Sequence, residues 1–210
     1  MKDKINMLEY ENRWLNLGAK FIAGMDEVGR GPLAGPVVCA SVIMPLDNII
    51  DGVNDSKKLS EKKRIILDKK IRELALSFSI VEIDPKTIDK INILNATKMG
   101  MVKAVNGLSV KPDVVLIDAV SLSDLAPTIK QESIIKGDMK SYSIACASIV
   151  AKVYRDNLMT QIADKYPGYN FAKHKGYGTK EHIEAIKKYG PCELHRKTFI
   201  KHFVKEEYNG

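Results

Sequence analysis

The chain has 210 residues, of which 45% are hydrophobic and 28% are charged. This length and composition favour a single domain over residues 1–210 with a sizeable core, and they exclude a disulfide-stapled miniprotein and a disordered chain. The 33 Lys and Arg residues against 26 Asp and Glu residues leave a net charge of +7, which favours a polyanionic partner.

Hydrophobic periodicity predicts an alternation of strands and helices. The expected elements, in chain order, are a helix in the second half of a polar lead-in over residues 1–18, strands over 20–25 and 36–44, a helix over 60–76, a strand over 78–83, a helix from 85 that Gly107 ends, strands over 114–117 and 129–135, a long helix over 141–165, and shorter helices over 180–189 and about 195–206. This order predicts an α/β fold with a mixed central sheet flanked by helices and a small helical C-terminal segment at about 180–210.

The cysteines and the amino terminus indicate a cytoplasmic protein. Cys39, Cys146 and Cys192 lie far apart without a CxxC pair, so we expect neither a disulfide framework nor a zinc ribbon. Residues 1–12 mix both charges and lack the apolar stretch of a secretory signal. No apolar run approaches the roughly 18 residues of a membrane span, so we expect no membrane association.

The most informative segment is GMDEVGRGPLAGP, residues 24–36. The spacing of Gly29 and Gly31 matches a dinucleotide-binding fingerprint, but β-branched residues follow where that motif requires a helix. A Walker A loop is excluded because no Gly-Lys-Ser/Thr sequence follows. Asp26 and Glu27 remain, at the end of a strand. Since neighbouring side chains on a strand point to opposite faces, these acids converge only where the strand twists or ends, and a solvated surface turn is the alternative.

Two further acids follow predicted strands. Asp118 ends the buried run VVLI, and Asp138 follows an Ile-Ile pair just before the long helix. An acid at the carboxyl end of a buried strand borders a cleft, although a helix cap is the alternative role for Asp138. Four carboxylates among basic residues predict hard divalent cations beside a polyanion. The four histidines form no HExxH motif, which argues against an imidazole-rich metal site.

Further motifs match one known family in order and along nearly the whole chain. They are NDSKKLS (54–60), LIDA (116–119), KGDMKS (136–141), ASIVAKVYRD (147–156), HKGYGT (174–179) and HRKTF (195–199). With the segment at 24–36, they resemble ribonuclease HII, the type 2 ribonuclease H family. In the sister ribonuclease HIII family the fourth acid is typically Glu, so Asp138 favours ribonuclease HII.

The resemblance implies a ribonuclease H-like fold and an endonuclease that uses two Mg²⁺ or Mn²⁺ ions. Its catalytic and metal-binding residues are then Asp26, Glu27, Asp118 and Asp138. The implied reactions are hydrolysis of the RNA strand of RNA/DNA hybrids and a cut on the 5′ side of single ribonucleotides in duplex DNA. Both leave 5′-phosphate and 3′-hydroxyl ends.

Substrate contacts are expected from loop and basic residues around the acids. The motif positions imply this role for Gly29, Arg30, Gly31, Lys57, Lys58, Lys175 and Tyr177. Single lysines are more often solvated charges, and a tyrosine is often a core residue, but the flanking glycines place Tyr177 in a loop where it can stack on a sugar or base. Asp156 is expected to pair with Lys152 or Arg155 and not with a metal.

Two other functions fit the same composition. One is a different metal nuclease of the same superfold, such as a resolvase or repair endonuclease, and the other is a non-catalytic basic module that binds nucleic acid. The resemblance favours a monomeric enzyme whose partners are RNA/DNA hybrids and ribonucleotide-containing duplex DNA.

Overall fold

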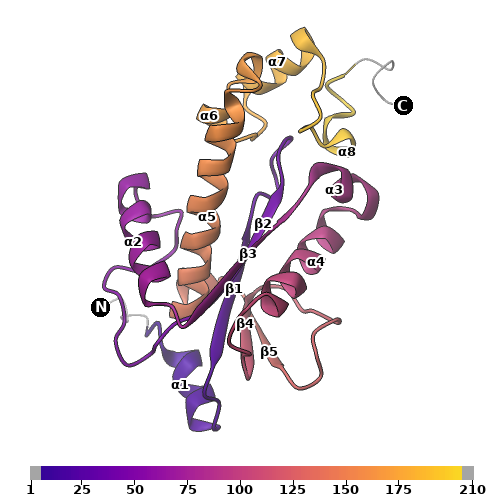
Figure 1. The fold of residues 1–210 in the computed structure, drawn as a ribbon. Helices are drawn as coiled ribbons and strands as arrows, with labels where there is room; N and C mark the ends of the chain where they lie inside the picture. Colours follow the sequence, from indigo (N-terminus) through magenta and orange to yellow (C-terminus); the bar gives the residue numbers. More distant parts are fainter. Residues whose placement is uncertain (1–5, 205–210) are drawn as a thin grey trace.

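A computed structural model of the chain describes residues 6–204 and is drawn as a ribbon in Figure 1. Within these residues, five strands form one sheet in the order β3-β2-β1-β4-β5. The strands are β1 (Ile22–Val28), β2 (Val37–Ile43), β3 (Ser77–Ile83), β4 (Val114–Asp118) and β5 (Lys130–Ile134). The first three are antiparallel neighbours, whereas β4 and β5 run parallel to β1. The predicted α/β class with a mixed sheet is confirmed.

Helices cover both faces of the sheet (Figure 1). The helices of the described chain are α1 (Glu9–Asn16), α2 (Glu61–Leu74), α3 (Pro85–Ile91), α4 (Ile93–Asn106), α5 (Tyr142–Ala163), α6 (Phe171–His174), α7 (Lys180–Tyr189) and α8 (Lys197–Ile200), with short 3-10 helices η1 (Gly137–Met139) and η2 (Pro167–Tyr169). α5 and α2 pack on one face, and α4 and α3 pack on the other. The core therefore has two layers, with the sheet between them.

Small residues let α5 approach the sheet closely. Ala145, Cys146 and Ala147 are fully buried against β1 and β2. Gly24 of β1 lies so near α5 that a Cβ atom there would overlap the backbone of Ser143. This close approach brings the polar side chains of α5 near the end of β1.

The single helix predicted from residue 85 to Gly107 is wrong, because Asn92 divides it into α3 and α4. Asn92 has φ 65°, in the left-handed region that Asn tolerates better than most residues. Its side-chain oxygen accepts a hydrogen bond from the N–H of Asn95 at 3.0 Å and so caps α4. The apolar spacing continues across this break because both helices face the same side of the sheet.

The helix predicted over about 195–206 is also mostly wrong. Only Lys197–Ile200 is helical, residues 201–204 form a turn or bend, and residues 205–206 lie outside the described part. His195 pairs with Ala34 in an isolated β-bridge, and Arg196 is extended. Because His195 and Arg196 contact the 29–36 loop in this way, the helix cannot begin before residue 197.

The structure also describes the state of the cysteines and the character of the helices. Cys39, Cys146 and Cys192 are unpaired, as predicted. Among residues 6–204, no helix has the length and apolar character needed to cross a membrane.

Candidate active site

Two neighbouring parallel strands bring Asp26 and Asp118 to the same place. Met25 of β1 pairs with Ile117 of β4, and the next residue on each strand is an acid. Gly24 contacts α5, and side chains alternate with a period of two along a strand. Asp26, two residues after Gly24, therefore faces α5. Leu116 packs in one cluster with Ile144 of α5, so Asp118, two residues after Leu116, faces α5 as well.

Glu27 leaves β1 on the opposite face. It pairs with Cys39, whose side chain lies in the cluster under α4, whereas Asp26 pairs with Ala40 under α5. Both carboxylates nevertheless line one pocket of about 340 Å³. The paired part of β4 ends beside Met25, so Glu27 reaches this pocket past the end of the neighbouring strand. The two acids thus line one pocket although they lie on opposite faces of β1.

The fourth acid stands just before α5. Asp138 lies in η1 and is buried. Its Oδ2 is 3.6 Å from the Nζ of Lys57. Burial raises the pKa of Asp138, Lys57 lowers it, and the charges of Asp55 and Asp118 raise it further. Asp138 is therefore within electrostatic reach of the acid at the end of β4.

Burial and like charges make ionisation of the two β1 acids costly. Desolvation, followed by the charge of Glu27, raises the pKa of Asp26 well above its usual value, although the hydroxyl of Ser148 opposes this shift. The pKa of Glu27 is also raised by desolvation, and Arg30 opposes it with a guanidinium 3.3 Å from Oε1. A bound cation would offset both effects.

The four acids supply carboxylate oxygens, the type of donor that a hard divalent cation prefers. One oxygen of each carboxylate already has a protein partner: the N–H of Glu27 for Asp26, Arg30 for Glu27, the N–H of Gly137 for Asp118, and Lys57 for Asp138. Glu27 Oε2 is buried and, among the described residues, has no hydrogen-bond partner. No three Asp, Glu, His or Cys side chains in residues 6–204 close around one metal position. Oxygen donors of this kind suit Mg²⁺ or Mn²⁺.

The 29–36 loop follows the two acids and presents backbone donors. Gly29 has φ +92°, and a Cβ atom there would overlap the Arg155 side chain. A Cβ atom on Gly31 would meet nothing within 4 Å. Packing thus requires glycine at position 29, whereas at position 31 the missing side chain leaves the backbone open to a ligand.

Tyr177 lies in an exposed turn beside this loop. It lines the pocket, its side chain is 41% exposed, and its ring centroid is 5.9 Å from the guanidinium carbon of Arg155. The carbonyl of Tyr177 accepts a hydrogen bond from His182 Nδ1 at 2.9 Å. The predicted loop position is observed, and a buried histidine supports it.

Three buried histidines under this turn form a neutral network. His182 Nδ1 donates to a carbonyl, so its Nε2 accepts from His195 Nε2 at 3.1 Å. His195 Nδ1 in turn accepts from the N–H of Cys192 at 2.9 Å. His174 likewise donates through Nε2 to a carbonyl and accepts through Nδ1 from the N–H of Gly176. Each ring is therefore a neutral tautomer with both nitrogens in use.

The predicted lysines differ in their surroundings. Lys57 lines the pocket with its side chain 80% exposed, and Lys58 is exposed beside Asp55 at 3.9 Å. The ammonium of Lys175 donates to the carbonyl of Ala172 at 2.6 Å and also contacts Thr160. Lys175 is thus already engaged by the protein and does not line the pocket.

Sequence reasoning missed several polar residues that complete the pocket. The missed residues are Ser56, Arg64, Ser148 and Lys152. Ser148 and Lys152 lie one helical turn apart on α5, and Lys152 Nζ is 2.7 Å from Asp156, the predicted partner. Polar residues four apart in the largely apolar first half of α5 were the available signal. Arg155 does not pair with Asp156, since it donates to backbone carbonyls.

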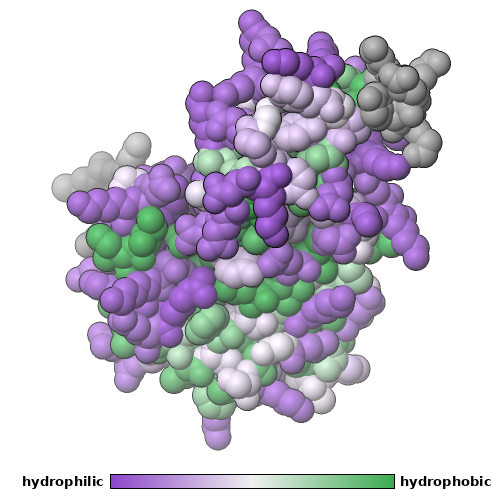
Figure 2. All heavy atoms as spheres, turned by 45° about the horizontal axis from the view of Figure 1, so that its top comes forward, coloured by the Kyte–Doolittle hydropathy of each residue, from purple (hydrophilic) through white to green (hydrophobic). Residues whose placement is uncertain are grey.

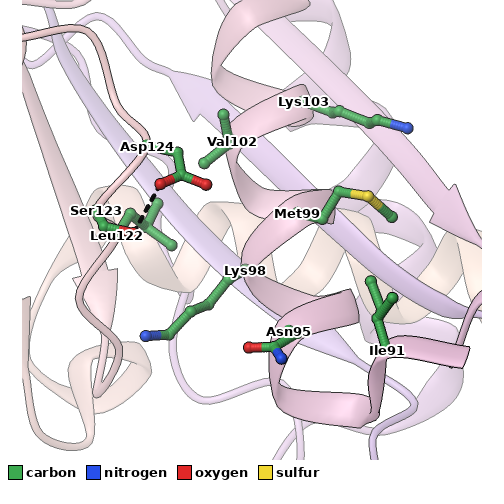
Figure 3. Close-up of a pocket in the computed structure, with 9 residues that line it drawn as sticks. All are labelled: Ile91, Asn95, Lys98, Met99, Val102, Lys103, Leu122, Ser123 and Asp124. Carbon is green, nitrogen blue, oxygen red and sulfur yellow. Dashed lines mark hydrogen bonds between the residues drawn. The ribbon is translucent and has the colours of Figure 1, made fainter.

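A larger pocket of about 570 Å³ lies between α4 and the loop after β4 (Figure 3). Lys98 and Asp124 flank it, and the Asp124 carboxylate accepts a hydrogen bond from the hydroxyl of Ser123 at 2.7 Å. Among the described residues, Asp124 is the one acid that lines this pocket. The pocket therefore lacks the neighbouring pair of carboxylates, Asp26 and Glu27, found at the end of β1.

A mixed sheet with acids at the ends of two neighbouring strands and a lysine beside them is an arrangement that suits a metal-dependent nuclease. The sequence matches the family model for ribonuclease HII over residues 23–205. The chain belongs to the ribonuclease HII family, a family of metal-dependent endonucleases that act on RNA/DNA hybrids. This assignment argues against the non-catalytic binding module.

Relatives and solved structures agree with this assignment. A ribonuclease HII of Caldicellulosiruptor bescii is 53% identical over 199 residues, which cover 95% of this chain and 96% of the relative. Another, from Acetivibrio thermocellus, is 54% identical over 95% of this chain and 77% of its own length. The ribonuclease H2 of Pyrococcus horikoshii OT3 matches with a TM-score of 0.73 and 27% identity, over 89% of this chain and all of that one.

Proposed function

We propose that this chain cuts duplex DNA on the 5′ side of a single embedded ribonucleotide, in addition to the RNA strand of hybrids, and leaves 5′-phosphate and 3′-hydroxyl ends. One observation carries the proposal, namely two backbone N–H groups of the 29–36 loop that face away from the protein. A 2′-hydroxyl can accept such a hydrogen bond, and this group distinguishes a ribonucleotide from its neighbours.

The direction of these donors follows from peptide geometry. The carbonyls of Gly29 and Arg30 accept hydrogen bonds from the buried Arg196. The described chain has no cis peptide bond, and in a trans peptide the N–H points opposite to the C=O. The N–H groups of Arg30 and Gly31 therefore point away from Arg196, and no described protein acceptor binds them.

We propose that Asp26, Glu27, Asp118 and Asp138 hold divalent cations at this site. The buried, unpartnered Glu27 Oε2 and the raised pKa values of Asp26 and Glu27 support this assignment. When bound, Mg²⁺ or Mn²⁺ supplies Lewis-acid stabilisation of the phosphate and lowers the pKa of an attacking water. Arg30 contacts one oxygen of Glu27, and Lys57 contacts one oxygen of Asp138. These two cationic side chains thereby orient the carboxylates.

Tyr177 and the lysines position the duplex in this proposal. The exposed ring of Tyr177 offers a face for a neighbouring sugar or base. Lys57 and Lys58 are exposed on the loop beside the acids and neutralise phosphates. Because all of these residues belong to one chain with unpaired cysteines, we take the active form to be a cytoplasmic monomer.

Cleavage of three matched substrates tests the proposal. They are a DNA duplex with one ribonucleotide, the same duplex with only deoxyribonucleotides, and an RNA/DNA hybrid. We expect cutting of the first on the 5′ side of the ribonucleotide, cutting of the hybrid, and none of the all-DNA duplex. Equal cutting of the all-DNA duplex would instead assign the chain to a repair-nuclease class.

The variant Gly31→Ala tests the role of the loop. Its added methyl group enters open space, so we expect an unchanged melting temperature and unchanged binding of plain duplex DNA. Cleavage at the ribonucleotide should fall by an amount that approaches 10²-fold, because a displacement of about 1 Å has that effect on an aligned reaction. Unchanged cleavage by this variant would remove the loop from the recognition of the 2′-hydroxyl.

A further inference from the structure

Two arginines under the 29–36 loop are fully buried without an acidic partner. Arg155 and Arg196 are 0% exposed, and neither forms an ion pair with an acid of residues 6–204. A buried charge is costly unless hydrogen bonds satisfy it. Burial, and then the charge of Arg155, lowers the pKa of Arg196 to about 9. Such a residue calls for an explanation beyond simple stability.

All side-chain hydrogen bonds of Arg196 go to carbonyls of the loop. Nη2 donates to Gly29 at 2.6 Å, Nη1 donates to Arg30 at 2.9 Å, and Nε and Nη2 donate to Gly35 at 3.0 and 2.8 Å. One planar group therefore fixes both ends of the loop. It also accounts for the orientation of the peptide planes before and after Arg30.

Arg155 extends this arrangement to the turn that carries Tyr177. It donates to the carbonyls of Pro36, Ala34 and Lys175 at 2.9 to 3.1 Å. The backbone of Gly176 also accepts hydrogen bonds from the N–H groups of Leu33 and Ala34. The loop and the Tyr177 turn are thus held together as one unit.

We propose that Arg196 is a positioning residue for ribonucleotide recognition, because its guanidinium turns the carbonyls of Gly29 and Arg30 inward and thereby aims the N–H groups of Arg30 and Gly31 at the 2′-hydroxyl. This inference rests on the proposed function. Arg196 does not touch the substrate itself, since it is fully buried.

The guanidinium is suited to this task in a way that an ammonium is not. Three carbonyls lie around Arg196, and the rigid fork of an arginine presents separate donors to each of them. A lysine concentrates its donors on one atom at the end of a flexible chain. Arg196→Lys therefore keeps the charge but releases at least one of the two peptide planes.

The first experiment compares Arg196→Lys with Arg72→Lys, a matched control. Arg72 pairs with Asp68 on α2 and does not line the site. We expect Arg196→Lys to lower kcat/KM on the single-ribonucleotide duplex by about 10²-fold, with binding of the all-DNA duplex changed less than about threefold. Arg72→Lys should change neither quantity. Equal losses in both quantities, or no loss, would overturn the proposal.

The second experiment observes the loop directly. ¹⁵N-labelled protein in EDTA is titrated with the single-ribonucleotide duplex and with its all-DNA counterpart. In the wild type, the amide signals of Arg30 and Gly31 should shift more with the ribonucleotide, and Arg196→Lys should abolish that difference. Amide signals that respond equally to both duplexes in the wild type would contradict the proposal.

Further outcomes separate the possible failures. If the wild type does not cut at a ribonucleotide, the proposed function itself fails. If Arg196→Lys does not fold, Arg196→Gln, which buries no charge, takes its place in both experiments. Should neither variant fold, Arg196 serves folding alone and the proposal is wrong.

Discussion

The four acids differ in what surrounds them, and Asp26 combines burial with the lack, among residues 6–204, of a basic side chain within ion-pair distance. Burial and the charges of Glu27 and Asp118 raise its pKa, and no basic side chain of the described chain lies within ion-pair distance of it. Glu27 and Asp138 each have a cationic neighbour. An ionised Asp26 therefore opposes folding unless a divalent cation binds.

The substitution Asp26→Asn should separate stability from activity. It removes an unfavourable buried charge at constant volume, so we expect a slightly higher melting temperature without divalent cations and unchanged duplex binding. Hydrolysis should fall by more than ~10²-fold, since even the outer partners of metal ligands contribute 10- to 100-fold. Melting curves with and without Mg²⁺ and single-turnover cleavage measure these effects.

A matched variant controls for the loss of a buried acid. Asp68 is also buried, but Arg72 holds its carboxylate at 2.8 and 3.0 Å, and Asp68 does not line the pocket. Asp68→Asn should leave cleavage intact, because Asp68 does not line the pocket. Near-normal turnover by Asp26→Asn in Mg²⁺ would contradict the assignment of that residue as a ligand.

At the scale of elements, the contact between α5 and β1 sets the distance between Ser148 and Asp26. Gly24 lies against the backbone of Ser143, and one turn further along α5 the hydroxyl of Ser148 lowers the pKa of Asp26. The helix therefore supplies a polar partner to the acid because no side chain separates the two elements at residue 24.

The substitution Gly24→Ala should be strongly destabilising. Its methyl group would overlap the α5 backbone, and overpacking of this kind costs about 1–3 kcal/mol or more. We expect a loss of at least ~2 kcal/mol in the free energy of unfolding, measured by urea titration. Gly31→Ala provides the contrast, because its methyl group meets open space. Equal stability of the two variants would argue against close packing at Gly24.

The sequence predicted elements well where the signal is local and less well where it depends on distant contacts. Asp118 could be placed because the buried run before it identifies β4. The break at Asn92 was missed since a left-handed Asn leaves the apolar spacing undisturbed. Ser148 could not be identified as a pocket residue, because its role depends on Asp26, which lies more than a hundred residues earlier.

At the scale of the whole molecule, the C-terminal segment supports the site from outside the sheet. α6 and α7 lie around the C-terminal end of α5, and α8 lies beside α3 (Figure 1). Their surface in Figure 2 is largely hydrophilic, and Lys173, Lys180, Lys187 and Lys188 are exposed there. Beneath it, buried histidines and aromatic rings pack together. This segment thus combines a basic exterior with a core that requires neutral imidazoles.

Acid should destabilise this segment through its histidines. Burial lowers the pKa of both His182 and His195 to about 4, whereas the unfolded value is about 6.5. Between these values the unfolded state binds more protons, so stability falls as the pH falls from about 6.5 towards 4. Melting temperatures measured across this range should decrease, and cleavage at the ribonucleotide should decrease with them.

The variant His182→Asn tests the origin of this pH dependence. Its amide can donate to the carbonyl of Tyr177 as His182 Nδ1 does, but it does not titrate. We expect a shallower decrease of melting temperature with acid than in the wild type. His202, which lies in the exposed turn after α8, is the control, and His202→Asn should retain the full slope.

The hydrogen bonds from Arg196 to the 29–36 loop join residues that are 161 to 167 positions apart. On the ribosome, the acids at the end of β1 emerge well before Arg196, which lies more than 160 residues further along the chain. A nascent chain can therefore assemble its carboxylates before its loop acquires a fixed orientation. Under the proposal for Arg196, selectivity for the ribonucleotide matures after the carboxylates are in place, so a chain that terminates before residue 196 should keep its acids but lose its choice of substrate.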